Sequence, residues 1–140
     1  DILDVATGTA DFAIIAAKHT KAQITGIDIS QGMLNIGAKK ITKEKLSHRI
    51  SLKNADSEYI PFKNNSFDAI TAGFGIRNFD DLSKGLKEIR RVLRVGGKIA
   101  ILEPTTPKYF PLKQLYKLYF NHLLPKIGSW IPKDKNAYND

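Results

Sequence analysis

The sequence contains no cysteine and only three histidines, and these shortages limit the chemistry open to the protein. Without cysteine there is no disulfide framework, no thiol nucleophile and no Cys-ligated metal. His19, His48 and His122 have no spacing typical of metal ligands, so we expect no metal site. The lack of cysteine is also compatible with a reducing compartment, and we expect a cytoplasmic protein.

Long apolar runs are missing as well. No stretch approaches the roughly 18 apolar residues of a membrane-spanning helix, and no signal peptide is recognisable. The chain opens inside an apolar run at Ile2 with no element before it, which suggests a fragment of a longer protein. Any contact with a membrane is therefore expected to be peripheral.

Acidic residues are outnumbered by basic ones. The 140 residues include 22 Lys and Arg against 14 Asp and Glu, which gives a net charge of +8. Such a charge can serve a nucleic acid, an anionic membrane surface or an acidic substrate. The length and the 42% hydrophobic content suit one domain with a real core.

The chain is organised around its first eleven residues, Asp1-Ile2-Leu3-Asp4-Val5-Ala6-Thr7-Gly8-Thr9-Ala10-Asp11. An apolar run meets a loop of small residues, and a helical pattern begins at Phe12. This order predicts a strand, a tight turn and a helix start, where unpaired N–H groups and a closely approachable backbone can hold a ligand.

Two carboxylates decide between nucleotide ligands at this turn. Asp28 ends the next apolar run, twenty positions after Gly8, which is the spacing of a carboxylate that binds a ribose. Asp4 would repel a pyrophosphate, and Ala6 and Ala10 replace the glycines of a dinucleotide fingerprint. S-adenosylmethionine has a ribose, an ammonium and a sulfonium but no phosphate, so this pattern favours S-adenosylmethionine over NAD.

Apolar runs alternate with helical patterns along the next ninety residues, which predicts an α/β fold with a doubly wound, mainly parallel sheet. Its ligand site is expected at the carboxyl ends of the strands, where Asp4, Asp28, Asp56 and the loop 73–78 fall. After the first run, the expected strands are Gln23–Ile27, Ile50–Lys53, Phe67–Ala72 and Lys98–Leu102. The expected helices are Phe12–His19, Gln31 to about Ile41 with Ser30 as its cap, and Asp80 as cap to about Leu93, ended by Gly96-Gly97.

Apolar positions in these helices predict the faces that pack on the sheet. In the second helix they are Met33, Leu34, Ala38 and Ile41, and in the third Leu82, Leu86, Ile89 and Leu93.

The composition changes after Glu103-Pro104. Residues 108–132 mix six aromatic side chains with lysines, and 112–123 place apolar residues on one helical face. This segment is expected either to cover the sheet or a partner domain, or to form a lid over an apolar aromatic substrate. We therefore divide one partial domain, 1–140, into a cofactor-binding core, 1–103, and a substrate-side segment, 104–140.

These pieces together resemble a class I S-adenosylmethionine-dependent methyltransferase and, more narrowly, the ubiquinone/menaquinone-biosynthesis C-methyltransferases. The class-wide features are the loop Asp4–Ala10, Asp28 and Arg94-Val95-Gly96-Gly97. The narrower ones are Pro61-Phe62 with Phe67-Asp68, the run Phe74-Gly75-Ile76-Arg77-Asn78 and Leu124-Pro125-Lys126-Ile127-Gly128. The family fold carries helices before the first strand and two further strands after the fifth, in agreement with a fragment.

The resemblance implies roles for particular residues of the cofactor site. It places Asp4 and Gly8 in the cofactor loop, with Thr9 at the methionine end, and Asp28 on the ribose. Asp56 and Ser57 become the adenine-side pair. Gly73 stands where a small polar residue is frequent, so a side-chain contact is lost there.

The implied reaction is C-methylation of a prenylated hydroquinone, such as demethylmenaquinol, by attack of a ring carbon on the sulfonium methyl. Candidate polar groups for this step are Arg77, Asn78 and His122. Arg77 has an alternative, structural role in an ion pair with an acid such as Asp80 or Asp81. The implied partner is the small quinol, with a peripheral membrane surface and a second copy of the chain as further candidates.

Other functions stay open. A methyltransferase of the same fold could act on another small molecule. The charge would suit an RNA-binding or RNA-modifying domain, but the basic residues are dispersed and no run for a flipped base follows the fourth strand. An NAD-dependent oxidoreductase is disfavoured by Asp4 and the two alanines. We therefore expect no nucleic-acid partner.

Overall fold

The computed structural model describes residues 1–104, 110–111 and 114. The chain forms two compact units, Asp1–Glu103 and Pro104–Asp140, and every element below belongs to the first. Most of the aromatic segment that follows Glu103, including His122, lies outside the described residues. None of the helices in the described part is long and apolar enough to cross a membrane.

A five-stranded parallel sheet forms the centre of this unit, with the strand order β3-β2-β1-β4-β5. The order reverses between β3 and β4, so the predicted doubly wound topology is confirmed. The strands are β1 Ile2–Val5, β2 Ile24–Asp28, β3 Ile50–Asn54, β4 Phe67–Gly73 and β5 Leu93–Leu102.

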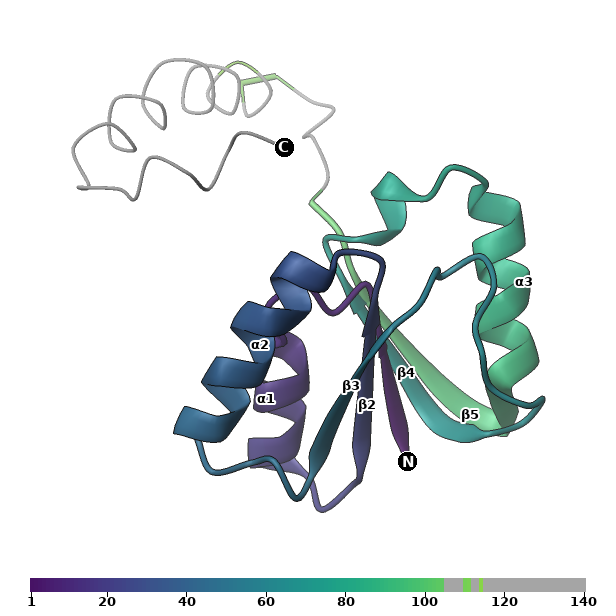
Figure 1. Ribbon diagram of the computed structural model, residues 1–140. Coiled ribbons are helices and arrows are strands. Elements are labelled where there is room, and N and C mark those ends of the chain that lie inside the picture. The colour runs from purple at the N-terminus through teal and green to yellow at the C-terminus, as the bar shows by residue number, and fades with distance from the viewer. Residues whose placement is uncertain (105–109, 112–113, 115–140) are drawn as a thin grey trace. The chain divides into compact units, whose positions relative to one another are not determined.

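Helices cover both faces of the sheet, with α1 and α2 on one face and α3 on the other (Figure 1). Strand residues alternate between the two faces, so each face has its own core. Leu3, Val5, Ile70 and Ile89 belong to the core beneath α3, and Ile24, Ala13 and Ile41 belong to the core beneath α1 and α2. The helices are α1 Asp11–His19, α2 Gln31–Lys43 and α3 Leu82–Val92, with a short 3₁₀ helix, η1, at Ile76–Asn78.

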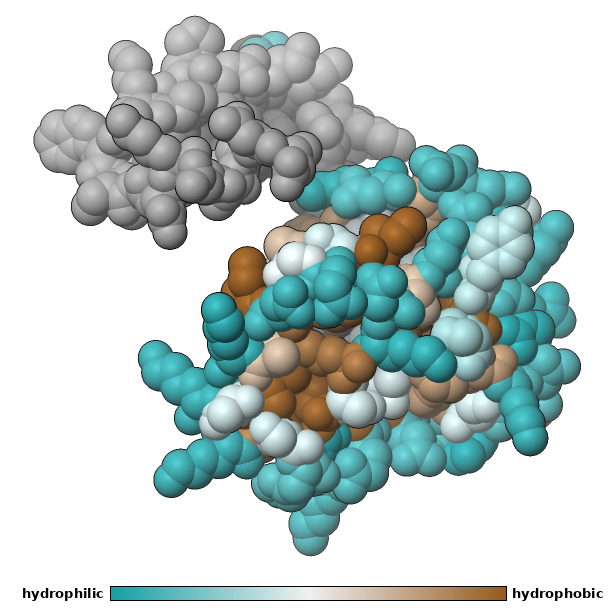
Figure 2. Space-filling view, viewed as in Figure 1, coloured by the Kyte–Doolittle hydropathy of each residue, from teal (hydrophilic) through white to brown (hydrophobic). Residues whose placement is uncertain are grey.

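The face of the molecule in view in Figure 2 is mainly hydrophilic. Polar and charged side chains cover most of the face in view, and apolar residues show in smaller areas between them (Figure 2).

The helix caps confirm one prediction and correct another. Ser30 caps α2 as predicted, because its hydroxyl accepts a hydrogen bond from the Met33 N–H. The cap of α3 is Asp81 rather than Asp80: the Asp81 carboxylate accepts the Lys84 N–H at 3.0 Å. The helix begins one residue later than predicted, which leaves the exposed Asp80 outside it.

The predicted apolar faces of α2 and α3 were partly wrong. On α3, Gly85, Ile89 and Val92 are buried, whereas Leu82 and Leu86 are exposed. The reason is Phe79, whose ring lies where a side chain at position 85 would stand, 2.3 Å from an added Cβ. On α2, Leu34, Gly37 and Ile41 are buried while Met33 and Ala38 are exposed.

Gly96 and Gly97 do not end the third helix, as predicted, but lie inside β5. The strand begins at Leu93, directly after α3, and pairs there with Phe67. Pairing resumes only at Lys98 with Ala69, so residues 94–97 bulge out of the sheet. Gly96 has a φ of +80°, which glycine adopts without strain, so the glycines serve the bulge.

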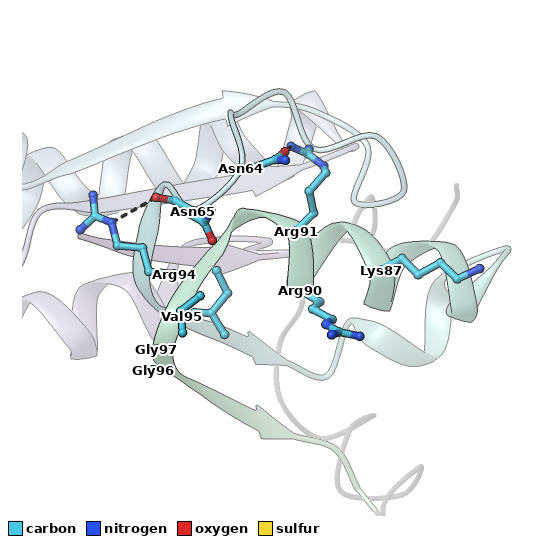
Figure 3. Close-up of a pocket in the computed structure, with 10 residues that line it drawn as sticks. Asn64, Asn65, Lys87, Arg90, Arg91, Arg94, Val95, Gly96 and Gly97 are labelled. Atoms are coloured by element: carbon cyan, nitrogen blue, oxygen red, sulfur yellow. Dashed lines mark hydrogen bonds between the residues drawn. The ribbon is translucent and has the colours of Figure 1, made fainter.

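A hollow of about 520 Å³ lies beside this bulge, at the start of β5 (Figure 3). Lys87, Arg90, Arg91 and Arg94 border it. The Arg94 guanidinium is held by the Asn65 carbonyl and by Asp68, and Arg91 by Glu88 and the Phe62 and Ile60 carbonyls. This hollow lies at the end of the sheet opposite the predicted ligand rim, and none of the predicted site residues that the structure describes lines it.

Candidate cofactor site

A groove runs along the carboxyl ends of the strands and consists of two adjoining hollows. The larger, about 430 Å³, is bordered by Phe12, Met33 and Phe74, and we call it the aromatic hollow. The smaller, about 160 Å³, is bordered by several carboxylates, and we call it the acidic hollow. Ala6, Asp28, Gly75 and Asn78 line both hollows, so the two form one continuous site.

Asp28 occupies the junction of the two hollows, at the end of β2. One carboxylate oxygen accepts the Gly8 N–H at 2.8 Å, and the other accepts the Ser30 N–H at 2.8 Å. These bonds fix the carboxylate between the loop after β1 and the start of α2. Each oxygen keeps a lone pair for a further donor, so the group can still accept two hydroxyls.

Asp4 lies beneath the groove and does not line it. Its side chain is only 1% exposed. Its two oxygens accept hydrogen bonds from the hydroxyls of Thr7 at 2.5 Å and Thr71 at 2.6 Å. Burial raises the pKa of this carboxyl, against the lowering effect of the threonine bonds. Thr7 borders the aromatic hollow, so the Thr7 hydroxyl connects the buried Asp4 with the groove wall.

The loop between β1 and α1 has three residues in the left-handed region: Ala6 at +53°, Gly8 at +54° and Ala10 at +63°. Glycine is favoured at such positions because a Cβ is disfavoured there. Two alanines accept this conformation here. Gly8 lies in the groove wall, where its N–H reaches Asp28.

Thr9 does not line either hollow. Its hydroxyl donates to Asp11 at 2.7 Å and accepts from the Lys40 ammonium at 2.8 Å. Lys40 also bonds Asp11 at 2.9 Å, and this bond lowers the pKa of the Asp11 carboxyl. Thr9 therefore connects the start of α1 with α2, while Asp11 itself borders the aromatic hollow.

Gly73 lines the aromatic hollow, and the structure shows why it has no side chain. A Cβ added there would lie 2.4 Å from the Phe12 ring. The space that a small polar residue could use is therefore filled by phenyl. Phe12 also meets Phe74 edge-to-face, with ring centroids 6.2 Å apart. The sequence predicts the loop 73–78 at this rim, but neither ring was predicted as a site residue, although Phe74 opens the most specific family motif.

The acidic hollow gathers Asp56 and Ser57 with three further carboxylates. The Asp56 carboxylate accepts the Glu58 N–H at 2.8 Å, and Ser57 is buried. Asp28, Glu58 and Asp80 are the other acids on its border. Such a wall accepts hydrogen bonds from amines and hydroxyls and repels phosphate.

Of the two predicted catalytic groups that the structure describes, Arg77 and Asn78, only Asn78 borders the groove, where it lines both hollows. Arg77 is 56% exposed and does not line either of them. Its guanidinium lies 4.0 Å from the Glu103 carboxylate. The alternative, structural role had suggested Asp80 or Asp81 as the acid, but the partner in the structure is Glu103. Glu103 in turn accepts the Ile76 N–H at 2.9 Å.

The sheet is parallel with this strand order, Asp28 is fixed at the end of β2, and an acid-lined hollow lies beside it. These features define the class of Rossmann-like domains that bind a nucleoside cofactor. More specifically, the chain belongs to the ubiE/COQ5 methyltransferase family, which matches residues 1–139.

Curated relatives agree with this assignment. A demethylmenaquinone methyltransferase of Bacteroides fragilis is 50% identical over 139 residues, covering 99% of this chain and 57% of the relative. A ubiquinone/menaquinone biosynthesis C-methyltransferase UbiE of Geotalea daltonii is 48% identical over 134 residues, covering 94% and 57%. The chain thus spans between half and two thirds of the length of these relatives.

Solved structures show the same fold. A Methanococcus maripaludis protein described as an S-adenosyl-L-methionine-dependent methyltransferase superposes with a TM-score of 0.74 at 26% identity, over 91% of this chain and 58% of that one. The [4+2]-cyclase SpnF superposes with a TM-score of 0.73 at 32% identity, over 77% and 40%.

Proposed function

We propose that this chain is part of an S-adenosylmethionine-dependent C-methyltransferase that acts on a prenylated hydroquinone, with residues 1–103 as its cofactor-binding core and 104–140 as its substrate-side segment. The observation that carries the proposal is the Asp28 carboxylate, fixed by two backbone N–H groups between two hollows of different chemistry. A carboxylate in that place can take the two hydroxyls of a ribose, with a base on one side and an amino-acid tail on the other.

The groove residues fit S-adenosylmethionine better than NAD. The acidic hollow offers Asp56 to an exocyclic amine, with Ser57 beside it, and has no cation on its border to hold a phosphate. The aromatic hollow offers Asp11 to an ammonium group and the Phe12 ring to a sulfonium, because aromatic faces attract cations. Family membership supports the same cofactor.

The names of the curated relatives support a quinol as the acceptor, demethylmenaquinol in the first place. The protein is proposed to be cytoplasmic. A prenylated quinol is a lipid, so the protein is also proposed to make peripheral contact with an anionic membrane. The excess of Lys and Arg supports that contact. A homo-oligomer is part of the same proposal.

Bound S-adenosylmethionine supplies an electrophilic methyl group, and the chain has to position the acceptor and handle its proton. Methylation at carbon requires a ring made electron-rich by loss of a phenolic proton. Asn78 borders both hollows and can hold a phenolic oxygen. Arg77 stays protonated, so its proposed part is to stabilise the developing phenolate or to hold a water that takes the proton. His122 remains a proposed base, outside the described residues.

Two measurements test the proposal. Isothermal titration should show binding of S-adenosylhomocysteine and none of NAD. Labelled S-adenosylmethionine should then transfer its methyl group to demethylmenaquinol. Binding of NAD in preference to S-adenosylhomocysteine, or methyl transfer to other small molecules only, would contradict it.

A second candidate function is methyl transfer by the same fold to a different small molecule. It is favoured by the superposition on a [4+2]-cyclase, because one fold can host several chemistries. A panel of non-quinol acceptors in the same labelling assay separates the two.

A further inference from the structure

Phe74 adopts a backbone conformation that large side chains avoid. Its φ is +60°, in the left-handed region where Gly and Asn are the usual residues. A phenylalanine there costs free energy relative to glycine, and such outliers gather at functional sites. The position therefore needs a reason for carrying a ring.

The neighbours of Phe74 show how the conformation is maintained. A Cβ at Gly73 would lie 2.4 Å from the Phe12 ring, and one at Gly75 would lie 2.4 Å from the Ala6 Cβ. Between them, the Phe74 N–H donates to the Leu102 carbonyl at 2.8 Å. The loop is thus packed against α1, the loop after β1 and the end of β5, and it has little freedom to turn the ring elsewhere.

Burial does not explain the ring. Phe74 is 46% exposed, and it borders the aromatic hollow. Its one aromatic contact among the described residues is edge-to-face with Phe12, at 68° between the ring planes. Much of the phenyl surface is thus left available on the wall of the hollow that adjoins the predicted cofactor site.

We infer that Phe74 is a specificity-determining residue whose ring holds the aromatic ring of the methyl acceptor in the aromatic hollow. The inference rests on the proposed function and names a residue that selects a flat aromatic acceptor. Aromatic rings pack offset or edge-to-face, which Phe74 and Phe12 together can offer to a naphthoquinol. The packing of the loop around Phe74 and the bond from its N–H to Leu102 keep the ring in place before the acceptor arrives.

The test compares Phe74→Gly and Phe74→Tyr with the wild-type chain and with Tyr59→Ala. Tyr59 is an exposed ring outside the groove and serves as the matched control. The probes are S-adenosylhomocysteine and, with it present, anaerobic 1,4-dihydroxynaphthalene. Affinities come from isothermal titration, and thermal unfolding monitors the fold.

We expect Phe74→Gly to weaken binding of 1,4-dihydroxynaphthalene by roughly threefold to tenfold, the usual range for one aromatic contact. Its affinity for S-adenosylhomocysteine should stay unchanged. Its unfolding temperature should not fall, because glycine adopts the positive φ without strain. Phe74→Tyr and Tyr59→Ala should bind both probes as the wild type does.

The inference is overturned if Phe74→Gly binds the ring probe as tightly as the wild type, or if the wild type does not bind that probe. It is also overturned if both affinities fall in step, because the ring then belongs to the cofactor site. Failure of the proposed function is distinguishable, since it appears in the wild type as absent S-adenosylhomocysteine binding or absent methyl transfer.

Discussion

At the residue scale, Asp28 is the side chain on which cofactor binding should depend most. Asp28→Ala removes the carboxylate that is proposed to accept the ribose hydroxyls, at roughly 1.5–3 kcal/mol for each charge-assisted hydrogen bond. It also removes the acceptor of the Gly8 and Ser30 N–H groups. We expect a large loss of S-adenosylhomocysteine affinity in isothermal titration. Glu44→Ala, an exposed acid outside the groove, should bind normally. An unchanged dissociation constant would remove Asp28 from the site.

Substitution of Arg77 distinguishes a catalytic from a structural role of this residue. If it stabilises the developing phenolate, Arg77→Ala should cut turnover by roughly a hundredfold or more, the usual effect of losing a preorganised donor. Cofactor affinity and unfolding temperature should stay nearly unchanged. Glu103→Gln breaks the same ion pair and is the matched control. If both variants lose activity only in step with stability, Arg77 belongs to the scaffold.

Asp4 gives a prediction about pH. Burial raises its pKa above the ordinary value of 3.8, so the folded state binds a proton at Asp4 more tightly than the unfolded state does. Its contribution to stability is therefore complete below about pH 4 and is lost as pH rises through the folded pKa. Asp4→Asn, which cannot ionise, lacks this loss. The unfolding temperature of the variant relative to the wild type should rise between pH 4 and pH 7; a constant difference would contradict the prediction.

At the element scale, the start of α3 depends on Asp81. Its carboxylate satisfies the Lys84 N–H, one of the donors left unpaired at a helix start. Asp81→Ala should lower the free energy of unfolding by about 1 kcal/mol, measured by denaturant titration. Asp80→Ala is the matched control, because Asp80 lies outside the helix and should leave stability unchanged. Equal losses from both variants would exclude the cap.

Two bulky helix residues illustrate how packing decides a face. Leu82 and Leu86 have the spacing of a buried stripe on α3, yet they are exposed. Phe79 takes the space over Gly85 and turns the buried face to Gly85, Ile89 and Val92. Spacing along a helix predicts that a face exists, but the neighbour decides which residues form it.

At the scale of the whole molecule, β5 is the edge of the described sheet and is poorly covered. Ile99, Ile101 and Leu102 are each nearly half exposed. An apolar edge strand pairs readily with another chain. We expect association that increases with concentration in analytical ultracentrifugation, and Ile101→Lys should reduce it while leaving the unfolding temperature within a few degrees. A monomer at all concentrations would show that other parts of the chain cover β5.

The sequence by itself determined the order of elements and the rim on which the site lies. Apolar runs separated by helical patterns are local properties, and parallel strands necessarily bring their carboxyl ends to one edge. This is why the doubly wound topology was predictable, and why Asp28, Asp56 and Gly73 border one groove. Ser30 followed as well, because a cap acts within three residues of itself.

Only the tertiary structure decided which of the rim residues face the groove. Asp4 is buried in the central strand β1, where Thr71 of the neighbouring strand donates to one of its oxygens. Thr9 does not line either hollow and instead bonds Lys40 of α2. Phe12 fills the space at Gly73, and the Glu103 carboxylate lies 4.0 Å from the Arg77 guanidinium. Each of these contacts joins segments that meet only when the sheet assembles, and local patterns carry no information about such neighbours.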